Sequence, residues 1–309
     1  MVVNGQAVFV TGMNYNIDYT QLPVDEQLTR HRRDFQIMRD AGVNAIIGWG
    51  IYDEFTLQVA EEYGIGVIMP FELDPNGSYE NQDYRNELKS NFRDYIARFR
   101  EFPAVWGWNP GGDELIYRMT TDEHRTVDKL QMAADFELEL AQLAYSLDPY
   151  HINVIKEPRD WYIKYLSDSL RRAKAQPGYK DLSASLVYGV NVYGHTDDIE
   201  LALTNAKSTL TGQLGIAMLV TEFGPFNSPP AERPLDYAEI WDVVARISDL
   251  GGLVYVFGPD QPNPKVAKPY DLHTLLPSQY SLVDMNDAPV DGSLAGLAAK
   301  WHVLRAASN

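Results

Sequence analysis

Eight short apolar runs recur along the chain, and each is followed by a polar turn and then by a segment with helical periodicity. We expect these runs to be strands at residues 8–15, 43–47, 66–71, 104–109, 151–155, 186–193, 216–221 and 252–257. Strands that alternate with helices form parallel βαβ units, and strands that are apolar almost throughout are covered on both faces. The pattern predicts an α/β protein with the fold of a (β/α)₈ TIM barrel.

The segments between the predicted strands carry signals for helices and turns. Helices are expected near residues 26–41, 53–63, 84–100, 133–147, 240–247 and 294–305, with Asp53 as an N-cap and Gly42 as a stop. Asn4 and Gly5 predict a turn in a short N-terminal hairpin. No linker divides the 309 residues, so we expect one domain over 1–309, with the proline-rich residues 259–269 as a loop over the barrel mouth.

The overall charge and the missing cysteines exclude several classes of function. A formal net charge of −17 argues against nucleic acid and anionic lipid as partners. The chain has no cysteine, which excludes disulfides, zinc–thiolate sites and iron–sulfur clusters. Its six histidines form no His-Glu-x-x-His zinc motif, so we expect no metal and no organic cofactor. No run of about 18 apolar residues is present, so no membrane insertion is expected.

Carboxylates follow two of the predicted strands. Barrel enzymes carry their active sites at the C-terminal ends of the strands. The strand at 104–109 runs into Asp113 and Glu114, and the strand at 216–221 ends in Glu222. Two carboxylates suit glycoside hydrolysis, because one acid protonates the leaving oxygen while the other carboxylate attacks the anomeric carbon or activates water. We therefore predict Glu114 and Glu222 as the catalytic residues.

Other side chains at the strand ends are candidates for binding a sugar substrate. Aromatic rings stack on the C–H faces of sugars, and carboxylates and amides hydrogen-bond sugar hydroxyls. The aromatic candidates are Trp49, Trp108, Tyr193 and Phe257, and the polar candidates are Glu72, Asp113 and Asn191. His195 also follows a strand, and the sequence favours a contact with the substrate and a structural hydrogen bond equally for this side chain.

Several of these patterns have a second interpretation. A single glutamate after a strand more often belongs to a loop or a salt bridge, so the pair is more specific than either residue. Glu157 follows the fifth predicted strand and is a candidate subsite residue, although a structural role is favoured. Residues 111–115 are similar to a diguanylate cyclase motif, which belongs on a hairpin of another fold. An aldolase-like barrel is disfavoured because no convincing lysine ends a predicted strand.

Several segments resemble those of the clan A glycoside hydrolases, whose acid/base and nucleophile glutamates end strands four and seven. The resemblance covers nearly the whole chain and includes Gly12-Met13-Asn14-Tyr15, residues 35–44, Phe102-Pro103-Ala104-Val105-Trp106-Gly107-Trp108, Thr221-Glu222-Phe223-Gly224 and residues 280–284. Within the clan, the first half is most similar to β-1,3-glucanosyltransferases and to the β-galactosidase/β-glucuronidase group. The resemblance implies Glu114 as acid/base, Glu222 as nucleophile, and Tyr193 as the aromatic residue that hydrogen-bonds the nucleophile.

The chain departs from the clan pattern at three places. Ile47 and Gly48 stand where the clan usually has an arginine at the end of strand two, and Phe257 stands where it usually has a tryptophan. Asp113 replaces the asparagine that normally bonds the sugar 2-hydroxyl, and an aspartate can accept that bond but cannot donate one. A second carboxylate beside Glu114 also tends to raise the pKa of one of the two.

The resemblance implies a retaining β-glycoside hydrolase or transglycosylase that acts on a β-linked glucan or a related oligo- or polysaccharide by double displacement. One alternative is a non-catalytic carbohydrate-binding barrel, which the missing arginine and tryptophan favour. Another is an enzyme for 2-amino sugars such as chitosan, which Asp113 and the acidic balance favour. A secreted, periplasmic or cell-surface location fits the habit of the family, although residues 1–6 do not read as a signal peptide. The oligomeric state stays open.

Overall fold

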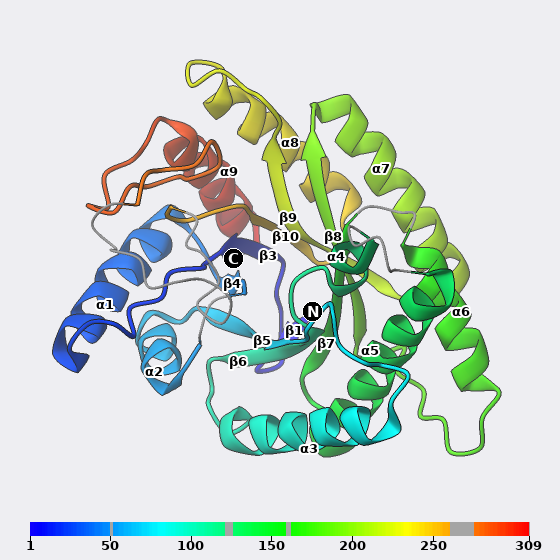
Figure 1. Ribbon diagram of the computed structural model, residues 1–309. Helices are drawn as coiled ribbons and strands as arrows, with labels where there is room; N and C mark the ends of the chain where they lie inside the picture. Colours follow the sequence, from blue (N-terminus) through cyan, green and yellow to red (C-terminus); the bar gives the residue numbers. More distant parts are fainter. Residues whose placement is uncertain (50–51, 121–125, 159–161, 260–274, 309) are drawn as a thin grey trace.

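A computed structural model describes residues 1–49, 52–120, 126–158, 162–259 and 275–308 of the chain. Parallel strands close into an eight-stranded barrel, in which each strand pairs with the next along the chain and the last returns to the first (Figure 1). In barrel order they are β3 (Val10–Asn14), β4 (Ala45–Ile47), β5 (Gly66–Glu72), β6 (Val105–Gly111), β7 (Ile152–Pro158), β8 (Leu186–Gly194), β9 (Ala217–Pro225) and β10 (Gly251–Val254). The predicted (β/α)₈ barrel is confirmed.

The N-terminal residues form the predicted hairpin outside the barrel. Strand β1 (Val2–Val3) pairs antiparallel with β2 (Gln6–Ala7). Asn4 and Gly5 both have positive φ angles, of 51° and 79°, as a two-residue turn of this kind requires. The Asn-Gly pair therefore accounts for the turn of the hairpin, as predicted.

Helices surround the barrel, as Figure 1 shows. They are α1 (Val24–Ala41), α2 (Glu54–Tyr63), α3 (Gln82–Phe99), α4 (Leu115–Thr120), α5 (Val127–Leu147), α6 (Ile163–Lys174), α7 (Thr196–Thr209), the π-helical turn η1 (Leu210–Leu214), α8 (Arg233–Ile247) and α9 (Ser293–Ser308). The short helix α4 was not predicted. Residues 260–269 of the expected mouth loop lie outside the described residues.

Local signals place the ends of the helices. The side chain of Asp53 accepts a hydrogen bond from the backbone N–H of Thr56 and caps α2, as predicted. Gly42 follows α1 with a φ of 93°, and its N–H bonds the carbonyl of Arg39. Only glycine adopts this left-handed conformation without cost, so Gly42 ends α1 where the sequence predicted.

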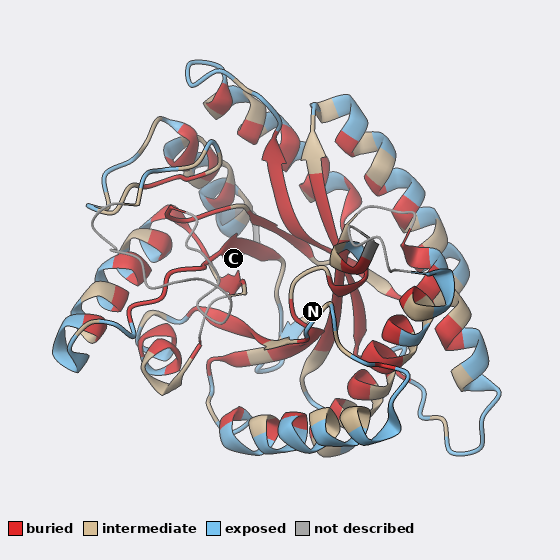
Figure 2. Ribbon diagram, viewed as in Figure 1, coloured by how far each residue is buried: buried red, intermediate tan, exposed pale blue. Residues whose placement is uncertain are grey.

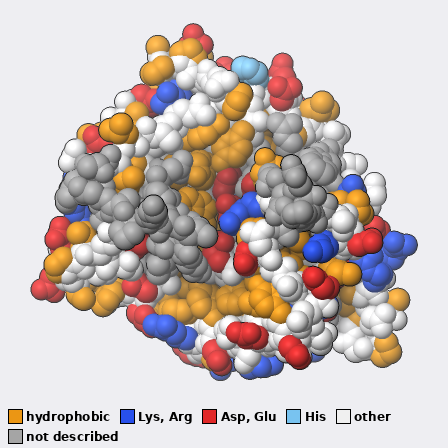
Figure 3. Space-filling view, viewed as in Figure 1, with side chains coloured by type: hydrophobic (Ala, Val, Ile, Leu, Met, Phe, Trp, Pro, Cys, Tyr) orange, Lys and Arg blue, Asp and Glu red, His pale blue; other side chains and the backbone are white. Residues whose placement is uncertain are grey.

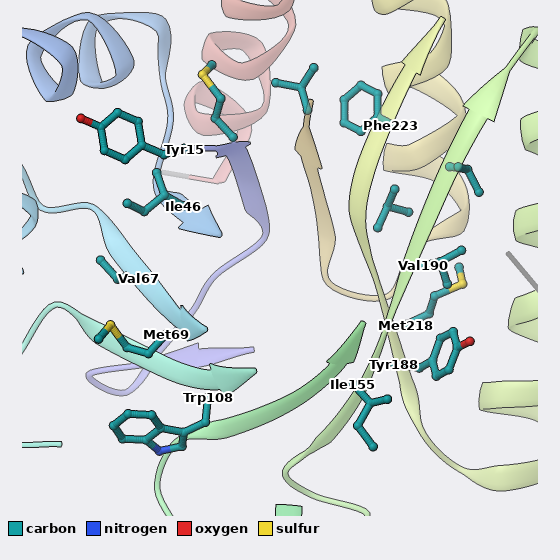
Figure 4. Packing of buried hydrophobic residues seen from close by; sticks show 14 of the residues in the cluster. Tyr15, Ile46, Val67, Met69, Trp108, Ile155, Tyr188, Val190, Met218 and Phe223 are labelled. Atoms are coloured by element: carbon teal, nitrogen blue, oxygen red, sulfur yellow. The ribbon is translucent and has the colours of Figure 1, made fainter. Parts of the chain in front are cut away.

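Side chains alternate between the inside and the outside of the barrel. An inner cluster of eight buried residues fills the barrel, namely Val10, Ala45, Ile47, Ile68, Val154, Val187, Leu219 and Leu253. Neighbouring strand residues such as Ile46, Val67 and Ile155 point away from the barrel and pack under the helices (Figure 4). The strands are buried on both faces (Figure 2), which explains their continuous apolar runs.

Candidate active site

The predicted catalytic residues meet at the C-terminal ends of the barrel strands. Glu114 follows β6 and starts α4, whereas Glu222 lies within β9 near its end. Acidic and basic side chains gather in a hollow on this face of the molecule (Figure 3). The close approach of Glu114 and Glu222 is reflected in the pKa of Glu114, which the charge of Glu222 raises.

Glu222 is buried and is held by two donors. Its side chain lies in the barrel mouth with 7% of its surface exposed, and Lys156 Nζ donates a hydrogen bond to Oε1 at 2.5 Å. The hydroxyl of Tyr193 donates to Oε2, which is the contact expected for this tyrosine. Burial raises the pKa of Glu222, and the ammonium of Lys156 opposes that rise. A carboxylate held in this way is fixed in orientation and supplied with a counter-charge.

Glu114 has a different environment. Its backbone has a φ of 47°, which is uncommon for a residue other than glycine. Asn191 Nδ2 donates to Oε1 of Glu114 at 2.7 Å, and Asn191 Oδ1 in turn accepts a hydrogen bond from Thr221. Burial, together with the charges of Asp113 and Glu222, raises the pKa of Glu114 to about 8. Glu114 therefore carries a proton at neutral pH, as a general acid must.

Lys156 is part of the site and was missed in the sequence. Its side chain is fully buried, and Nζ donates to Asp113 Oδ1 at 2.8 Å as well as to Glu222. The fifth strand was predicted to end at Ile155, but β7 continues to Pro158. Because Val154 faces into the barrel and side chains alternate, Lys156 also faces inward. Counting this alternation two residues further would have found it.

The prediction that no lysine ends a strand is therefore wrong. The charge of Lys156 nevertheless disfavours aldolase chemistry. Burial lowers the pKa of Lys156, but the carboxylates of Asp113 and Glu222 outweigh burial, and the net pKa is raised. A lysine that attacks a carbonyl must lose its proton, and this one is held in the charged form.

Glu157 points away from the substrate face, in agreement with the structural role that the sequence favoured over a subsite role. Its side chain is buried on the outer face of β7 and accepts the backbone N–H groups of Ile116 and Tyr117 at 2.6 and 3.1 Å. These contacts hold the first turn of α4, directly after Glu114. Neighbouring strand residues face opposite sides, which explains why Lys156 enters the site and Glu157 does not.

Two predicted stacking residues belong to the core and cannot contact a substrate. Trp108 is completely buried, packs against Tyr95 and donates its indole N–H to Asp148 at 3.0 Å. Phe257 is also completely buried and packs against Tyr15. Both rings belong to the main core cluster, and neither has exposed surface. Their prediction as sugar-stacking residues is corrected.

The remaining candidates lie at the rim. Glu72, at the end of β5, is within 3.5 Å of Arg118, and only 9% of its side chain is exposed. Trp49 is partly exposed after β4, and its backbone N–H bonds Asn16. His195 precedes α7 and lines a cavity beside Glu114.

That cavity has a volume of about 660 Å³ and opens beside the candidate acid. It is lined by Glu114, Tyr117, Pro158, Asn191, Tyr193, Gly194, His195, Asp198 and Phe226. Tyr117 and Phe226 are exposed by 41% and 51%, so their rings are accessible there. Neither was predicted. Phe226 directly follows β9, whose predicted end at Thr221 was four residues short of the observed end at Pro225, so the position of Phe226 at the rim was not recognised.

Two features are absent from the described residues. No group of three or more His, Cys, Asp or Glu side chains there is arranged to hold a metal ion. None of the helices in those same residues is long and apolar enough to cross a membrane.

Comparison with known proteins shows similarity in structure only. No family model matches the chain, and no curated protein matches its sequence. A β-glucuronidase from Bacteroides uniformis superposes with a TM-score of 0.69 at 18% identity, covering 96% of this chain and 35% of that one. A β-D-glucuronidase from Dictyoglomus thermophilum gives 0.66 at 16% identity, covering 96% and 50%.

A β-galacturonidase from Eisenbergiella tayi, of family GH2 and bound to galacturonate, also gives 0.66 at 16% identity, covering 97% of this chain and 52% of that one. The chain thus spans a third to a half of the length of these proteins. At this level of identity the likeness concerns the fold. The chain has a (β/α)₈ barrel of the kind found in these glycoside hydrolases, in line with the resemblance to clan A.

Proposed function

We propose that this chain is a retaining β-glycoside hydrolase or transglycosylase, with Glu222 as nucleophile and Glu114 as acid/base. The observation that carries the proposal is the contrast between the two carboxyl groups. Glu222 is paired with an ammonium and a hydroxyl, whereas Glu114 is held by an amide and keeps its proton to about pH 8. Burial raises the pKa of both groups, but only Glu222 hydrogen-bonds a cation that favours its ionised form, which is the difference expected between an acid and a nucleophile.

Glu114 and Glu222 have different roles in the two steps of the reaction. Glu114 gives its proton to the leaving oxygen while Glu222 attacks the anomeric carbon and forms a glycosyl–enzyme intermediate. Glu114, now ionised, then takes a proton from the acceptor as the acceptor attacks that carbon and releases Glu222. Retaining enzymes of this kind have their carboxyl groups about 5–5.5 Å apart. Water as acceptor gives hydrolysis, and a sugar hydroxyl gives transglycosylation.

The side chains that line the cavity beside Glu114 favour a carbohydrate without negative charge as the substrate. Tyr117 and Phe226 present exposed rings on which the C–H face of a sugar can stack. The described residues that line this cavity include the acidic side chains of Glu114 and Asp198 but no lysine or arginine. A uronate would need a cation there, so we favour a neutral β-linked glucan or oligosaccharide over the uronides named for the structural neighbours.

The second candidate function is action on 2-amino sugars such as chitosan. The acidic lining of the cavity favours it, because Asp198 and Glu114 both line it. Asp113 favours an amino sugar less than its position in the sequence suggested, because its carboxylate already pairs with Lys156. A substrate ammonium would therefore have to compete with a buried lysine for the same carboxylate.

The test is an assay on a panel of β-glucan, xylan, chitosan and uronide oligosaccharides, with products identified by mass spectrometry. Wild type and Glu222→Gln are compared. Shortened or lengthened products from wild type alone support the proposal and identify the sugar. Glycan binding by both proteins, without products from either, would favour the non-catalytic carbohydrate-binding barrel.

A further inference from the structure

Lys156 brings a positive charge into the centre of the proposed active site. Its side chain has no exposed surface, and its ammonium lies 2.8 Å from Asp113 Oδ1 and 2.5 Å from Glu222 Oε1. A buried charge is tolerated only when it is paired and hydrogen-bonded. The contacts with Asp113 and Glu222 satisfy this requirement, and they also tie β7 to β9 and to the loop after β6.

Among the described residues, Lys156 alone forms an ion pair with Glu222. The end of β4 cannot supply a second cation. A Cβ atom on Gly48 would come within 2.3 Å of Asn16 Oδ1 and 2.9 Å of the Tyr52 hydroxyl, so no longer side chain fits at that position. Ile47, one residue earlier, belongs to the inner apolar cluster of the barrel. The counter-charge for Glu222 therefore comes from the fifth barrel strand.

We propose that Lys156 is the positioning residue that holds Glu222 ionised and fixed in orientation for attack, with Asp113 as its second anchor. This inference rests on the proposed function and adds a residue to it. Lys156 need not contact the substrate for this role. It acts through Glu222, because it lowers the cost of a negative charge inside a buried site.

The other groups around Lys156 determine what its removal would do. They are Asp113 and Glu114 from the loop after β6 and Tyr52 after β4, while Tyr193 from β8 contacts Glu222 on its other oxygen. Without the ammonium, three carboxyl groups would face one another in a site with little solvent. Like charges at short range favour protonation of one or more members. Glu222 would then take up a proton and lose its ability to attack.

The first experiment is the pH dependence of kcat/KM for wild type, Lys156→Met and Lys156→Arg, on the substrate found by the glycan panel. We expect Lys156→Met to lower kcat by about 100-fold or more with a smaller change in KM, and to move the acid limb of the profile to higher pH. Lys156→Arg keeps the charge and should retain part of the activity with an acid limb close to that of wild type.

Lys300→Met is the matched control, because Lys300 pairs with Asp242 on the surface. It should leave both kcat and the pH profile unchanged. A Lys156→Met profile with the acid limb of wild type would overturn the proposal, even if overall activity fell.

A second variant guards against a simple folding defect. The chain contains no cysteine, so Lys156→Cys introduces its only thiol. Alkylation of the unfolded variant with 2-bromoethylamine, in which the thiolate displaces bromide, rebuilds an ammonium at nearly the original length. After refolding, we expect this product to recover kcat, whereas alkylation with iodoacetamide gives a neutral side chain that does not. Equal activity of the two products would overturn the proposal.

The third measurement does not depend on activity. NMR of protein labelled at lysine Cε and at glutamate Cδ, assigned with Lys156→Met and Glu222→Gln, follows both groups directly. We expect Lys156 to keep its charge at pH values where ordinary lysines lose their proton, and the Glu222 signal to titrate at higher pH in Lys156→Met. Titration of Lys156 below about pH 9 would overturn the proposal. If no glycoside is turned over but both shifts are seen, the proposed function fails and the pairing of Lys156 with Glu222 is supported.

Discussion

At the scale of single residues, hydrogen-bond donors separate two chemically identical side chains. Glu222 receives a lysine ammonium and a tyrosine hydroxyl, and Glu114 receives the amide of Asn191. An ammonium stabilises the ionised form of a carboxyl group more strongly than an amide does. The assignment of acid and nucleophile follows from this difference, and it does not depend on the order of the residues in the chain.

The pKa of Glu114 predicts the alkaline side of the pH profile. Because Glu114 keeps its proton to about pH 8, kcat/KM should fall as the pH rises through that value. Glu114→Gln should lose this alkaline limb. It should also lose about 100-fold or more on substrates with poor leaving groups, and much less on activated aryl glycosides. Equal losses on both kinds of substrate would contradict the role of Glu114 as acid.

A second carboxyl group, Asp34, predicts how stability depends on pH. It is fully buried in α1 and accepts hydrogen bonds from the hydroxyls of Tyr15 and Tyr19 at 2.6 and 2.9 Å. Burial raises its pKa to about 7, above the value of an unfolded aspartate. The stability it contributes is therefore fully present below about pH 4 and is lost as the pH rises to about 7.

The variant Asp34→Asn isolates this effect. His31 lies in the same network, and burial lowers its pKa to about 4, which lowers stability as the pH falls. Both proteins share His31, so the difference between them belongs to Asp34. Urea unfolding should show the free energy of wild type falling relative to Asp34→Asn between about pH 4 and pH 7, by up to about 4 kcal/mol. Parallel curves would contradict the shift.

At the scale of elements, the strands were predictable from the sequence, whereas the end of β7 and the short helix α4 were not. Each of the eight predicted strands overlaps an observed one, since apolar runs between helical segments have few other interpretations. The end of β7 was not clear beforehand, because Lys156 and Glu157 break the apolar run. The short helix α4 has no apolar repeat of its own, and its first turn is held by Glu157 from another strand.

This limit of sequence reasoning explains the errors at the site. The two glutamates and Tyr193 were found because each lies at a strand end whose position was clear. Trp108 and Phe257 were assigned to the wrong side, since a strand end predicts where a residue lies and not which way it points. Lys156 was missed because its strand was predicted to end one residue earlier, so the inward direction of its side chain was not considered.

The contact between β7 and α4 predicts a linked loss of stability and activity. Glu157→Ala leaves the N–H groups of Ile116 and Tyr117 without their buried acceptor, which should cost about 3 kcal/mol in the free energy of unfolding. The loop that carries Glu114 should also move, so kcat should fall. Glu157→Gln should lose less, because its amide oxygen still accepts. Glu101→Ala, at an exposed glutamate, is the control and should change neither quantity.

At the scale of the whole molecule, two exposed aromatic rings, those of Tyr117 and Phe226, line the cavity at the end of the barrel that carries Glu114. Phe226→Ala should raise KM for long oligosaccharides by about 3- to 10-fold with little change in kcat, because the ring is exposed in the cavity beside Glu114. Tyr150→Ala is the matched control, since Tyr150 is 93% exposed and precedes β7 at the opposite end of the barrel. Similar effects from both substitutions would contradict a specific subsite.

The most direct test of the central claim is to trap the intermediate on Glu222. Wild type and Glu222→Gln are incubated with a 2-deoxy-2-fluoro glycoside of the sugar identified by the panel, carrying an activated leaving group. Mass spectrometry of the intact protein and of its peptides then locates any adduct. The account predicts one glycosyl group on the peptide that contains Glu222 in wild type, and none in the variant. Turnover with inversion of configuration, or an adduct on another carboxylate, would contradict it.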